Sequence, residues 1–364
     1  MIEDFTDEQQ ELRTVVRRFL AEHSAESDVR AQMATTPGYD PRVWDTLAGQ
    51  IGAHGLAIPE QYGGQGFGWV ELGIVLEEMG RALLCAPFFA SVVLAATTIL
   101  ESGDEQAKQR MLPGLADGSS IGTVVLPGAG TAVHATLDGD VWTLSGSAGL
   151  VLDGHVADLI VIPASTSDGV RLFTVGGATT GVVATPVQTL DQTRKLADLA
   201  FSGAAGTPLG APGAAEEILA RVQDLAVIGL ALEQVGGAAA ALDLSVEYLK
   251  TRVQFGQPIG AFQALKHMAA DVFVEVETAR SAAYYAMFAV ADDSADVPAA
   301  AALAGAYCTD AFVGATHQMI QFHGGMGFTW ELPAHLYFKR ARSGQLLLGA
   351  PETHRERLAQ LIGL

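Results

Sequence analysis

Cysteine and positive charge are both scarce in this sequence. Its 364 residues include only two cysteines, Cys85 and Cys308, which lie far apart in apolar surroundings. This usage argues against a disulfide framework and predicts two buried thiols in a reducing compartment. Lysine and arginine number 21 against 41 aspartates and glutamates, for a formal net charge of −20. The shortage of positive charge argues against binding to nucleic acid or to an anionic membrane surface.

Targeting, membrane-spanning and metal-binding patterns are also lacking. The first five residues are acidic and apolar, without the basic region and apolar core of a signal peptide. We find no uninterrupted apolar stretch of bilayer-spanning length, and therefore expect no membrane insertion. His317 and His323 are six residues apart and would not share a helix face, so we expect no zinc site. These absences predict a cytoplasmic protein.

Hydrophobic periodicity predicts helices at both ends of the chain. Thr6 to Gln9 reads as a capping box before a helix. The polar stretch from about 24 to 40 resembles a loop, and the section up to about 117 is otherwise mainly helical. From about 212 onward three long segments have helical patterns, 214–251, 261–285 and 298–323. Gly236 and Gly237 mark a point where the first of these would pack closely.

The segment between about 120 and 205 has a different hydrophobic pattern. Short apolar or alternating runs, such as 141–144, 159–162 and 171–175, are separated by glycine and aspartate turns. This pattern is typical of a small β-sandwich or barrel. We therefore predict an α+β protein with three domains: an N-terminal helical domain (1–117), a middle β domain (118–208) and a C-terminal four-helix bundle (209–364).

Two clusters in the C-terminal part carry the strongest functional signal. The first runs from Arg252 through Phe255 to Gln263, and the second from Gln321 to Gly327 with Gly324 and Gly325 inside it. An arginine fork suits a diphosphate, and paired glycines let a ligand approach the backbone closely. With the order of helices, β domain and helical bundle, these clusters resemble the acyl-CoA dehydrogenase family over essentially the whole chain. Its members are flavoenzymes that oxidise acyl-CoA thioesters to enoyl-CoA.

The resemblance implies a set of FAD-contacting residues. In that family each flavin lies between two subunits, and the C-terminal domain of one subunit holds the adenine-diphosphate end of the flavin bound by its partner. By motif, Arg252 would meet the pyrophosphate and Phe255 would pack nearby. Gln263 and Gln321 would hydrogen-bond the diphosphate and adenine, and Gly324 and Gly325 would let the backbone approach the cofactor closely. Taken singly, each has a plainer interpretation as a helix-end charge, a core residue or a helix stop.

The flavin ring site departs from the family pattern. A Thr-Glu-Pro-Gly-Ala-Gly-Ser-Asp loop is usual, and here residues 125–132 read Val-Leu-Pro-Gly-Ala-Gly-Thr-Ala. Val125 cannot form the hydrogen bond that a threonine hydroxyl would form to the isoalloxazine ring. Farther on, Leu150-Val151-Leu152 stands where the family has Trp-Ile-Thr. An aromatic wall and a second hydroxyl are both lost, so this subunit's own flavin site is expected to be degraded.

The catalytic base is missing as well. Family chemistry needs a carboxylate over the α carbon of the thioester, and the two usual positions carry Leu348 and Ala226. Glu352 is a weak substitute candidate; Asp224 and His354 are the other titratable groups nearby. We expect all three to be solvated or capping residues.

These features most resemble the base-lacking subunit of heteromeric α2β2 acyl-CoA dehydrogenases of actinobacterial steroid side-chain degradation. The resemblance implies a second acyl-CoA dehydrogenase subunit that holds most of the FAD, an acyl-CoA substrate and an electron-transferring flavoprotein as acceptor. Two alternatives stay open. The chain could be a complete homo-oligomeric dehydrogenase with an unrecognised base, or a non-redox acyl-CoA-binding scaffold.

Overall fold

The computed structural model describes residues 5–126 and 130–364 and divides into two compact units. Unit 1 is made of the ranges Met1–Val29, Trp69–Leu84 and Val227–Leu364, and unit 2 of Arg30–Gly68 and Cys85–Ala226. Residues 127–129, in the middle of the predicted flavin loop, lie outside the described residues. Each unit is built from segments that are distant in sequence, so its core depends on long-range contacts.

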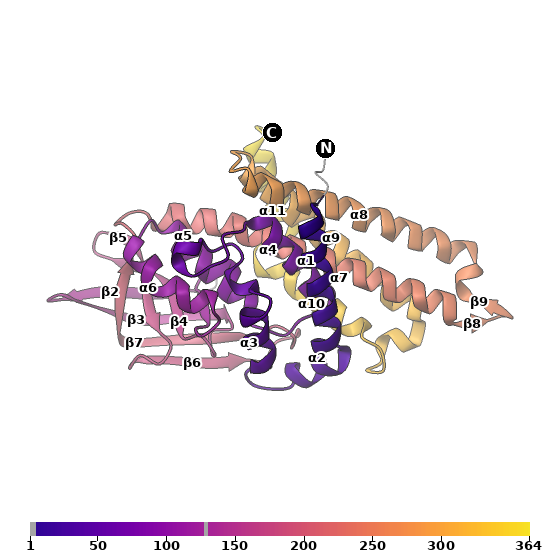
Figure 1. Ribbon diagram of the computed structural model, residues 1–364, viewed down its shortest axis with the longest axis horizontal. Helices are drawn as coiled ribbons and strands as arrows, with labels where there is room; N and C mark the ends of the chain where they lie inside the picture. Colours follow the sequence, from indigo (N-terminus) through magenta and orange to yellow (C-terminus); the bar gives the residue numbers. More distant parts are fainter. Residues whose placement is uncertain (1–4, 127–129) are drawn as a thin grey trace. The chain divides into compact units, whose positions relative to one another are not determined.

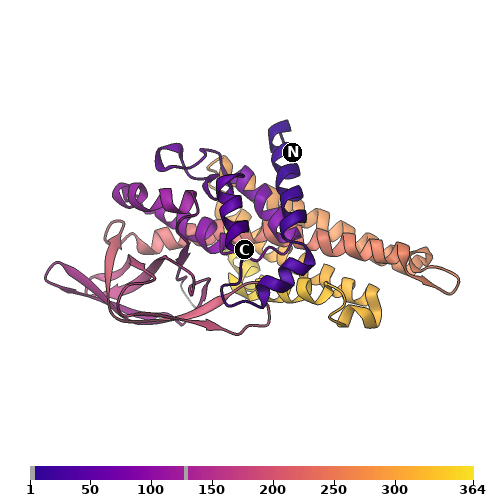
Figure 2. The same cartoon turned by 60° about the horizontal axis from the view of Figure 1, so that its bottom comes forward.

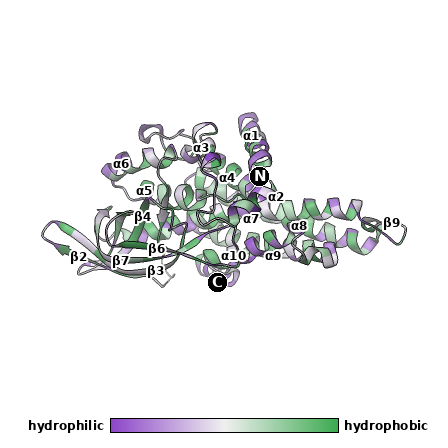
Figure 3. Ribbon diagram, turned by 90° about the horizontal axis from the view of Figure 1, so that it is seen from below, coloured by the Kyte–Doolittle hydropathy of each residue, from purple (hydrophilic) through white to green (hydrophobic). Residues whose placement is uncertain are grey.

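Unit 1 is a helical assembly dominated by long antiparallel helices (Figure 1). Its elements are α1 (Asp7–His23), α4 (Trp69–Arg81), the greater part of α7 (Ala215–Thr251), β8 (Val253–Gln254), β9 (Gln257–Pro258), η4 (Ile259–Ala261), α8 (Gln263–Ala291), α9 (Val297–His323), η5 (Gly324–Phe328), α10 (Ala334–Leu347) and α11 (Pro351–Leu361). Hydrophobic and hydrophilic residues alternate along α8 and α9, as expected of helices with one buried face (Figure 3).

Unit 2 combines short helices with a closed β-sheet (Figure 2). Its helical elements are α3 (Pro41–Gly49), η1 (Ala53–Gly55), η2 (Glu60–Tyr62), the π-helical η3 (Phe89–Ala96), α5 (Thr97–Glu101) and α6 (Glu105–Ala116). Its strands are β1 (Gly122–Val124), β2 (Ala132–Asp138), β3 (Val141–Leu152), β4 (Leu159–Thr166), β5 (Gly169–Gly176), β6 (Val182–Val187) and β7 (Leu196–Leu209). Strands β4, β5, β7, β3 and β2 pair in turn, and β2 returns to β4, which closes the sheet around a core that includes Leu144, Ile160 and Phe173.

The predicted α+β fold class and the three long C-terminal helices are confirmed. The predicted loop between 24 and 40 is wrong, because it contains helix α2 (Glu26–Met33). Val29 and Met33 lie one turn apart on this helix and are both buried. Two apolar residues in a short polar helix give a weak periodic signal, and tertiary burial decides the outcome. The three domain boundaries stay a prediction.

The expectation that no apolar stretch is long enough to span a bilayer is wrong for two helices. An 18-residue window of α7 has a mean hydropathy of 1.7, and one in Val297–Phe328 reaches 1.2, so both are long and apolar enough by composition. The window in α7 is entirely buried, as in the core helix of a soluble protein, and that in Val297–Phe328 is 61% buried. In α7 the charged Glu233 and the glycine pair Gly236 and Gly237 interrupt the apolar run, so the sequence alone did not single it out.

The predicted close-packing point at Gly236 is confirmed as a helix crossing between α4 and α7. A Cβ built on Gly236 would lie 1.8 Å from the carbonyl oxygen of Glu77. Reciprocally, a Cβ built on Gly80 would lie 1.9 Å from the carbonyl oxygen of Glu233. Both glycines are therefore needed for the two backbones to touch, a contact that larger side chains would prevent.

A buried charge network joins α1, α4 and α8 beside that crossing. Glu77 is 4% exposed and accepts hydrogen bonds from Arg13 at 2.8 Å, Arg280 at 3.2 Å and the Tyr284 hydroxyl at 2.6 Å. Burial alone would raise the pKa of Glu77, but Arg13, the Tyr284 hydrogen bond and Arg280 together hold it below its usual range. Burial, followed by the Glu77 charge, raises the pKa of Tyr284 above its usual range. The carboxylate is therefore the centre of a satisfied ionic cluster.

Both cysteines are free and buried, as predicted. Cys308 donates to the carbonyl oxygen of Ala279, and burial raises the pKa of its thiol to about 12. A thiol of this kind stays protonated and acts as a small core residue.

His54 is a fully buried histidine in unit 2. Its ring packs edge-on against Trp44 and Phe88, with centroid separations of 4.0 and 5.4 Å. Burial lowers the pKa of His54 to about 4, although the Leu47 carbonyl and Asp117 act in the opposite direction. Burial dominates because neither ring nitrogen forms a hydrogen bond with a described residue.

This histidine predicts an acid-sensitive step in unfolding. The unfolded imidazole binds a proton near pH 6.5, whereas the folded one does so only near pH 4. His54 therefore leaves the free energy of unfolding unchanged above pH 6.5. Its proton uptake in the unfolded state should lower that free energy by about 3 kcal/mol as the pH drops to 4. Urea unfolding of wild type and His54→Leu at pH 7 and 4.5 gives the free energy of unfolding of each protein. This free energy should fall less between the two pH values in the variant than in the wild type. An equal fall in both proteins would contradict the prediction.

Candidate functional site

The first predicted cluster lies on a hairpin that extends α7. Arg252 follows the last residue of the helix, and β8 and β9 pair through a two-residue turn. The turn residues Phe255 and Gly256 have φ angles of +54° and +81°, as a type I′ turn requires. A phenylalanine in the left-handed region is uncommon and costs about 1–2 kcal/mol. The strained turn holds Phe255 with 86% of its surface exposed.

The remaining predicted FAD contacts lie at the neighbouring helix ends. Gln263 is the first residue of α8, Gln321 is in the last turn of α9, and both are exposed. Gly324 ends α9 with a φ of +57°, which favours glycine. A Cβ built on Gly324 or Gly325 would meet nothing within 4 Å, so the backbone there is open to a ligand.

Ring contacts bring these helix ends together. Tyr248 of α7 stacks on His323 of α9 with ring centroids 4.2 Å apart. Phe255 of the hairpin faces Phe262, just before α8, at 6.1 Å. The hairpin and the ends of α7, α8 and α9 thus form one end of unit 1, here called the bundle end (Figure 1). All six predicted FAD contacts, among them Arg252, are exposed on it.

The positions that would hold a flavin ring in this subunit lack polar side chains. Val125 is 1% exposed, and its backbone N–H already donates to Val161 at 2.8 Å. Leu152 is 4% exposed and its carbonyl accepts from the Thr123 hydroxyl. Leu150 lies at an irregularity in the β3–β7 pairing, with a φ of +56° and 54% of its surface exposed. None of the three side chains can donate or accept a hydrogen bond.

Both base positions are filled by buried aliphatic residues. Leu348 is 5% exposed at the end of α10, and Ala226 in α7 is fully buried. Glu352 in the first turn of α11 is turned outward, with 79% of its side chain exposed and Arg355 4.0 Å away. The exposure of Glu352 fits the expected solvated carboxylate.

Two other titratable residues were wrongly expected to be solvated or capping. Asp224 is 4% exposed and His354 is 6% exposed. A Cβ built on Gly305 of α9 would lie 3.0 Å from the His354 ring, and one on Gly349 would lie 3.3 Å from it. The two glycines make the space that this ring occupies. Pro351 and His354, both buried and three residues apart, carried a helical spacing from which the burial could have been inferred.

The two histidines considered as metal ligands lie in separate surroundings. Among the described residues, no three His, Cys, Asp or Glu side chains gather as ligands would. His317 is exposed and stacks on Phe338 at 5.2 Å, whereas His323 is buried and contacts the Met319 carbonyl through Nδ1. The two histidines therefore serve separate packing contacts.

Comparison with family models covers both ends of the chain. Residues 6–119 match the N-terminal domain of acyl-CoA dehydrogenases, and residues 224–363 match the C-terminal domain. The acyl-CoA dehydrogenase IpdE2 of Mycolicibacterium smegmatis is 37% identical over 355 residues, which cover 97% of this chain and 98% of that protein.

Solved structures agree over nearly the full length. The steroid ACAD Tcur3481–Tcur3483 is 32% identical, with a TM-score of 0.88 and 98% of each chain covered. The ChsE4–ChsE5 complex of Mycobacterium tuberculosis is 27% identical, with a TM-score of 0.90 and coverage of 99% of this chain and 98% of that one. Each of these two names joins two proteins.

Proposed function

Because the chain belongs to the acyl-CoA dehydrogenase family, we propose that it is the base-lacking subunit of a heteromeric, FAD-dependent acyl-CoA dehydrogenase. When bound, FAD would supply the acceptor for a hydride from the β carbon of the acyl group, and the reaction also needs a carboxylate to remove the α proton. In the proposed assembly a second acyl-CoA dehydrogenase subunit supplies the carboxylate and the contacts to the flavin ring. This chain supplies the bundle end.

One asymmetry carries the proposal. The residues that would reach across to a partner's flavin are present and exposed, with an open backbone at Gly324 and Gly325. The positions that would act within the subunit carry Val125, Leu152 and Leu348, all buried and apolar. A diphosphate fits the first set, because arginine donates in a fork and carboxamides can donate beside it. The second set offers no polar partner to a flavin ring and no proton acceptor.

The relatives suggest the substrate class and support a partner. The two solved structures above are named as a steroid ACAD and as a two-protein complex. We therefore propose a steroid-derived acyl-CoA thioester as substrate and an α2β2 assembly with a base-bearing subunit. An electron-transferring flavoprotein is the proposed electron acceptor.

The first test is the visible spectrum and the solution mass of the purified chain. We expect little flavin absorbance from the chain alone. Co-expression with a family member that has glutamate at either base position should yield a heteromer with bound flavin. A yellow homo-oligomer with about one flavin per chain would contradict the proposal, since the apolar ring site would then be sufficient.

Arg252→Ala tests the role of the bundle end. We expect flavin affinity of the heteromer to fall by about 10- to 100-fold, because a charge-assisted hydrogen bond contributes about 1.5–3 kcal/mol. Flavin released from the denatured complex, measured per heteromer, gives the occupancy. Lys250→Ala is the matched control, since it removes an exposed cation two residues away that pairs with Glu247. Unchanged occupancy in Arg252→Ala would remove this residue from the flavin site.

One observation favours the alternative of a complete homo-oligomeric dehydrogenase. The Thr131 hydroxyl, in the loop that faces flavin in the family, is buried without a hydrogen-bond partner among the described residues. A bound flavin could supply that partner. His354 is buried, with its ring beside Gly349, and would be the substitute base. Dehydrogenase activity of the chain alone that is lost in His354→Gln would establish this alternative.

A further inference from the structure

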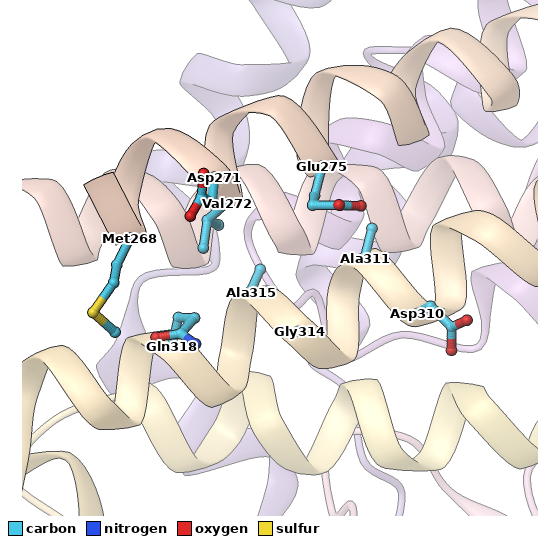
Figure 4. Close-up of a pocket in the computed structure, with 9 residues that line it drawn as sticks. All are labelled: Met268, Asp271, Val272, Glu275, Asp310, Ala311, Gly314, Ala315 and Gln318. Carbon is cyan, nitrogen blue, oxygen red and sulfur yellow. The ribbon is translucent and has the colours of Figure 1, made fainter. Parts of the chain in front are cut away.

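A groove between α8 and α9 has no role in the site described above. Its volume is about 290 Å³, and its walls come from both helices (Figure 4). Met268 and Val272 form the apolar wall on α8, and Ala311, Gly314 and Ala315 form the floor on α9. The groove exists because these α9 positions carry no side chain longer than a methyl group. Helices dock against such grooves by inserting a side chain between the ridges.

The polar atoms of the groove are mainly acceptors. The Oε1 atom of Gln318 is buried and has no hydrogen-bond partner among the described residues. Asp271 is exposed at the rim and forms no ion pair with a described residue. Glu275 accepts from the Tyr307 hydroxyl at 2.8 Å, and Asp310 pairs with Arg355. With an apolar wall and acceptors at the floor and rim, the groove fits an aliphatic stem that ends in a positive charge.

The groove is continuous with the bundle end. Gln318 lies one helical turn before Gln321, and Met268 lies five residues after Gln263. A subunit whose flavin reaches Gln263 and Gln321 would therefore also cover the adjoining surface of α8 and α9. A second copy of this chain is a poorer match, since each copy carries a net charge of −20 and would bring like charge toward an acidic groove.

We infer that the α8–α9 groove receives a lysine or arginine side chain from a helix of the base-bearing partner subunit. The inference rests on the proposed function for the identity of that subunit. The side chain's stem packs on Met268, Val272 and the alanines, and its charged head is held by Gln318 and Asp271. This contact holds the two subunits together and is separate from the flavin contacts of the bundle end.

Gly314 gives a direct test. A Cβ built there meets nothing within 4 Å, so a larger side chain can enter the groove without disturbing the fold. Gly314→Leu should fill the groove and weaken the complex with the co-expressed base-bearing subunit by about tenfold or more, as loss of an interface anchor does. Gly314→Ala is the matched control and should assemble normally. Sedimentation of the heteromer over a dilution series gives the affinity, and thermal unfolding of the isolated chain checks the fold.

Asp271→Asn tests the charge of the occupant. Association of the wild type should weaken as salt is raised, and that dependence should be smaller in Asp271→Asn, because a pair at the rim is screened. The same salt dependence in both proteins would exclude a cationic occupant at Asp271. Wild-type affinity in Gly314→Leu, or no complex with any base-bearing family member, would overturn the inference. If Gly314→Leu instead abolished a homodimer, the inference would also be overturned, and the groove would bind a second copy of this chain.

The flavin measurement separates this inference from the proposed function. Arg252→Ala should lower flavin occupancy and leave assembly intact, whereas Gly314→Leu should lower assembly. If Gly314→Leu weakens the heteromer but Arg252→Ala retains full flavin, the groove stands and the flavin role of the bundle end fails. If Gly314→Leu assembles normally but Arg252→Ala loses flavin, the groove has no role in assembly and the flavin role of the bundle end stands.

Discussion

Glu77→Ala should be among the most destabilising single changes in unit 1. The variant would leave the Arg13 and Arg280 guanidiniums beside each other without their shared carboxylate. Removing one partner of a buried ion pair costs about 3–5 kcal/mol. Arg13 keeps a contact with Glu78 and Arg280 keeps one with Glu277, so we expect a loss at the lower end of that range. Chemical unfolding should show this as a large fall in the denaturant midpoint. The matched control is Glu247→Ala, which breaks an exposed pair with Lys250 and should change stability little.

The pH dependence offers a second readout of the same cluster. The folded-state pKa of Glu77 lies below its usual range, so its contribution is present above the ordinary glutamate pKa. The contribution is lost as the pH falls through the folded-state value. Wild type should therefore lose more stability than Glu77→Ala below about pH 4. A Glu77→Ala protein as stable as wild type at pH 7 would show that the cluster has no net stabilising effect.

Gly236→Ala should be equally severe, for a steric reason. The added methyl group would lie 1.8 Å from a backbone oxygen of α4 and 2.9 Å from the backbone nitrogen of Arg81. Backbone atoms cannot rotate away as a side chain can, so α4 and α7 must separate. Overpacking commonly costs about 1–3 kcal/mol, and a backbone clash at a helix crossing belongs at or above the upper end.

Gly314→Ala is the matched control for this prediction. It makes the same chemical change inside a long helix of the same unit, where a Cβ has open space around it. Alanine should stabilise that helix by about 0.5–1 kcal/mol through its higher helix propensity. Thermal unfolding of the two variants should therefore move in opposite directions. If both proteins unfold at the same temperature, the crossing tolerates a methyl group and the helices there are not in backbone contact.

The family resemblance at Arg252–Gln263 and Gln321–Gly327 could be recognised from the sequence because each motif is local. Turn residues, helix ends and their polar side chains lie within a few positions of one another, and the structure places both motifs at exposed helix ends. The apolar residues at Leu348, Ala226 and Val125 were readable for the same reason, since a side chain without polar atoms lacks that chemistry in any fold. What each FAD-contacting residue binds stays a prediction.

Burial and contact between distant segments could not be read in this way. Periodicity and motifs are local properties, and they were enough to predict the long helices, the β domain and the residues at the base and flavin positions. The tertiary structure alone decided that α2 forms, that Glu77 meets Arg13 and Arg280, and that His354 fills the space beside Gly305. It alone also opened the α8–α9 groove at Gly314. These features depend on which segments meet in space, and such long-range contacts leave only a weak trace in one sequence.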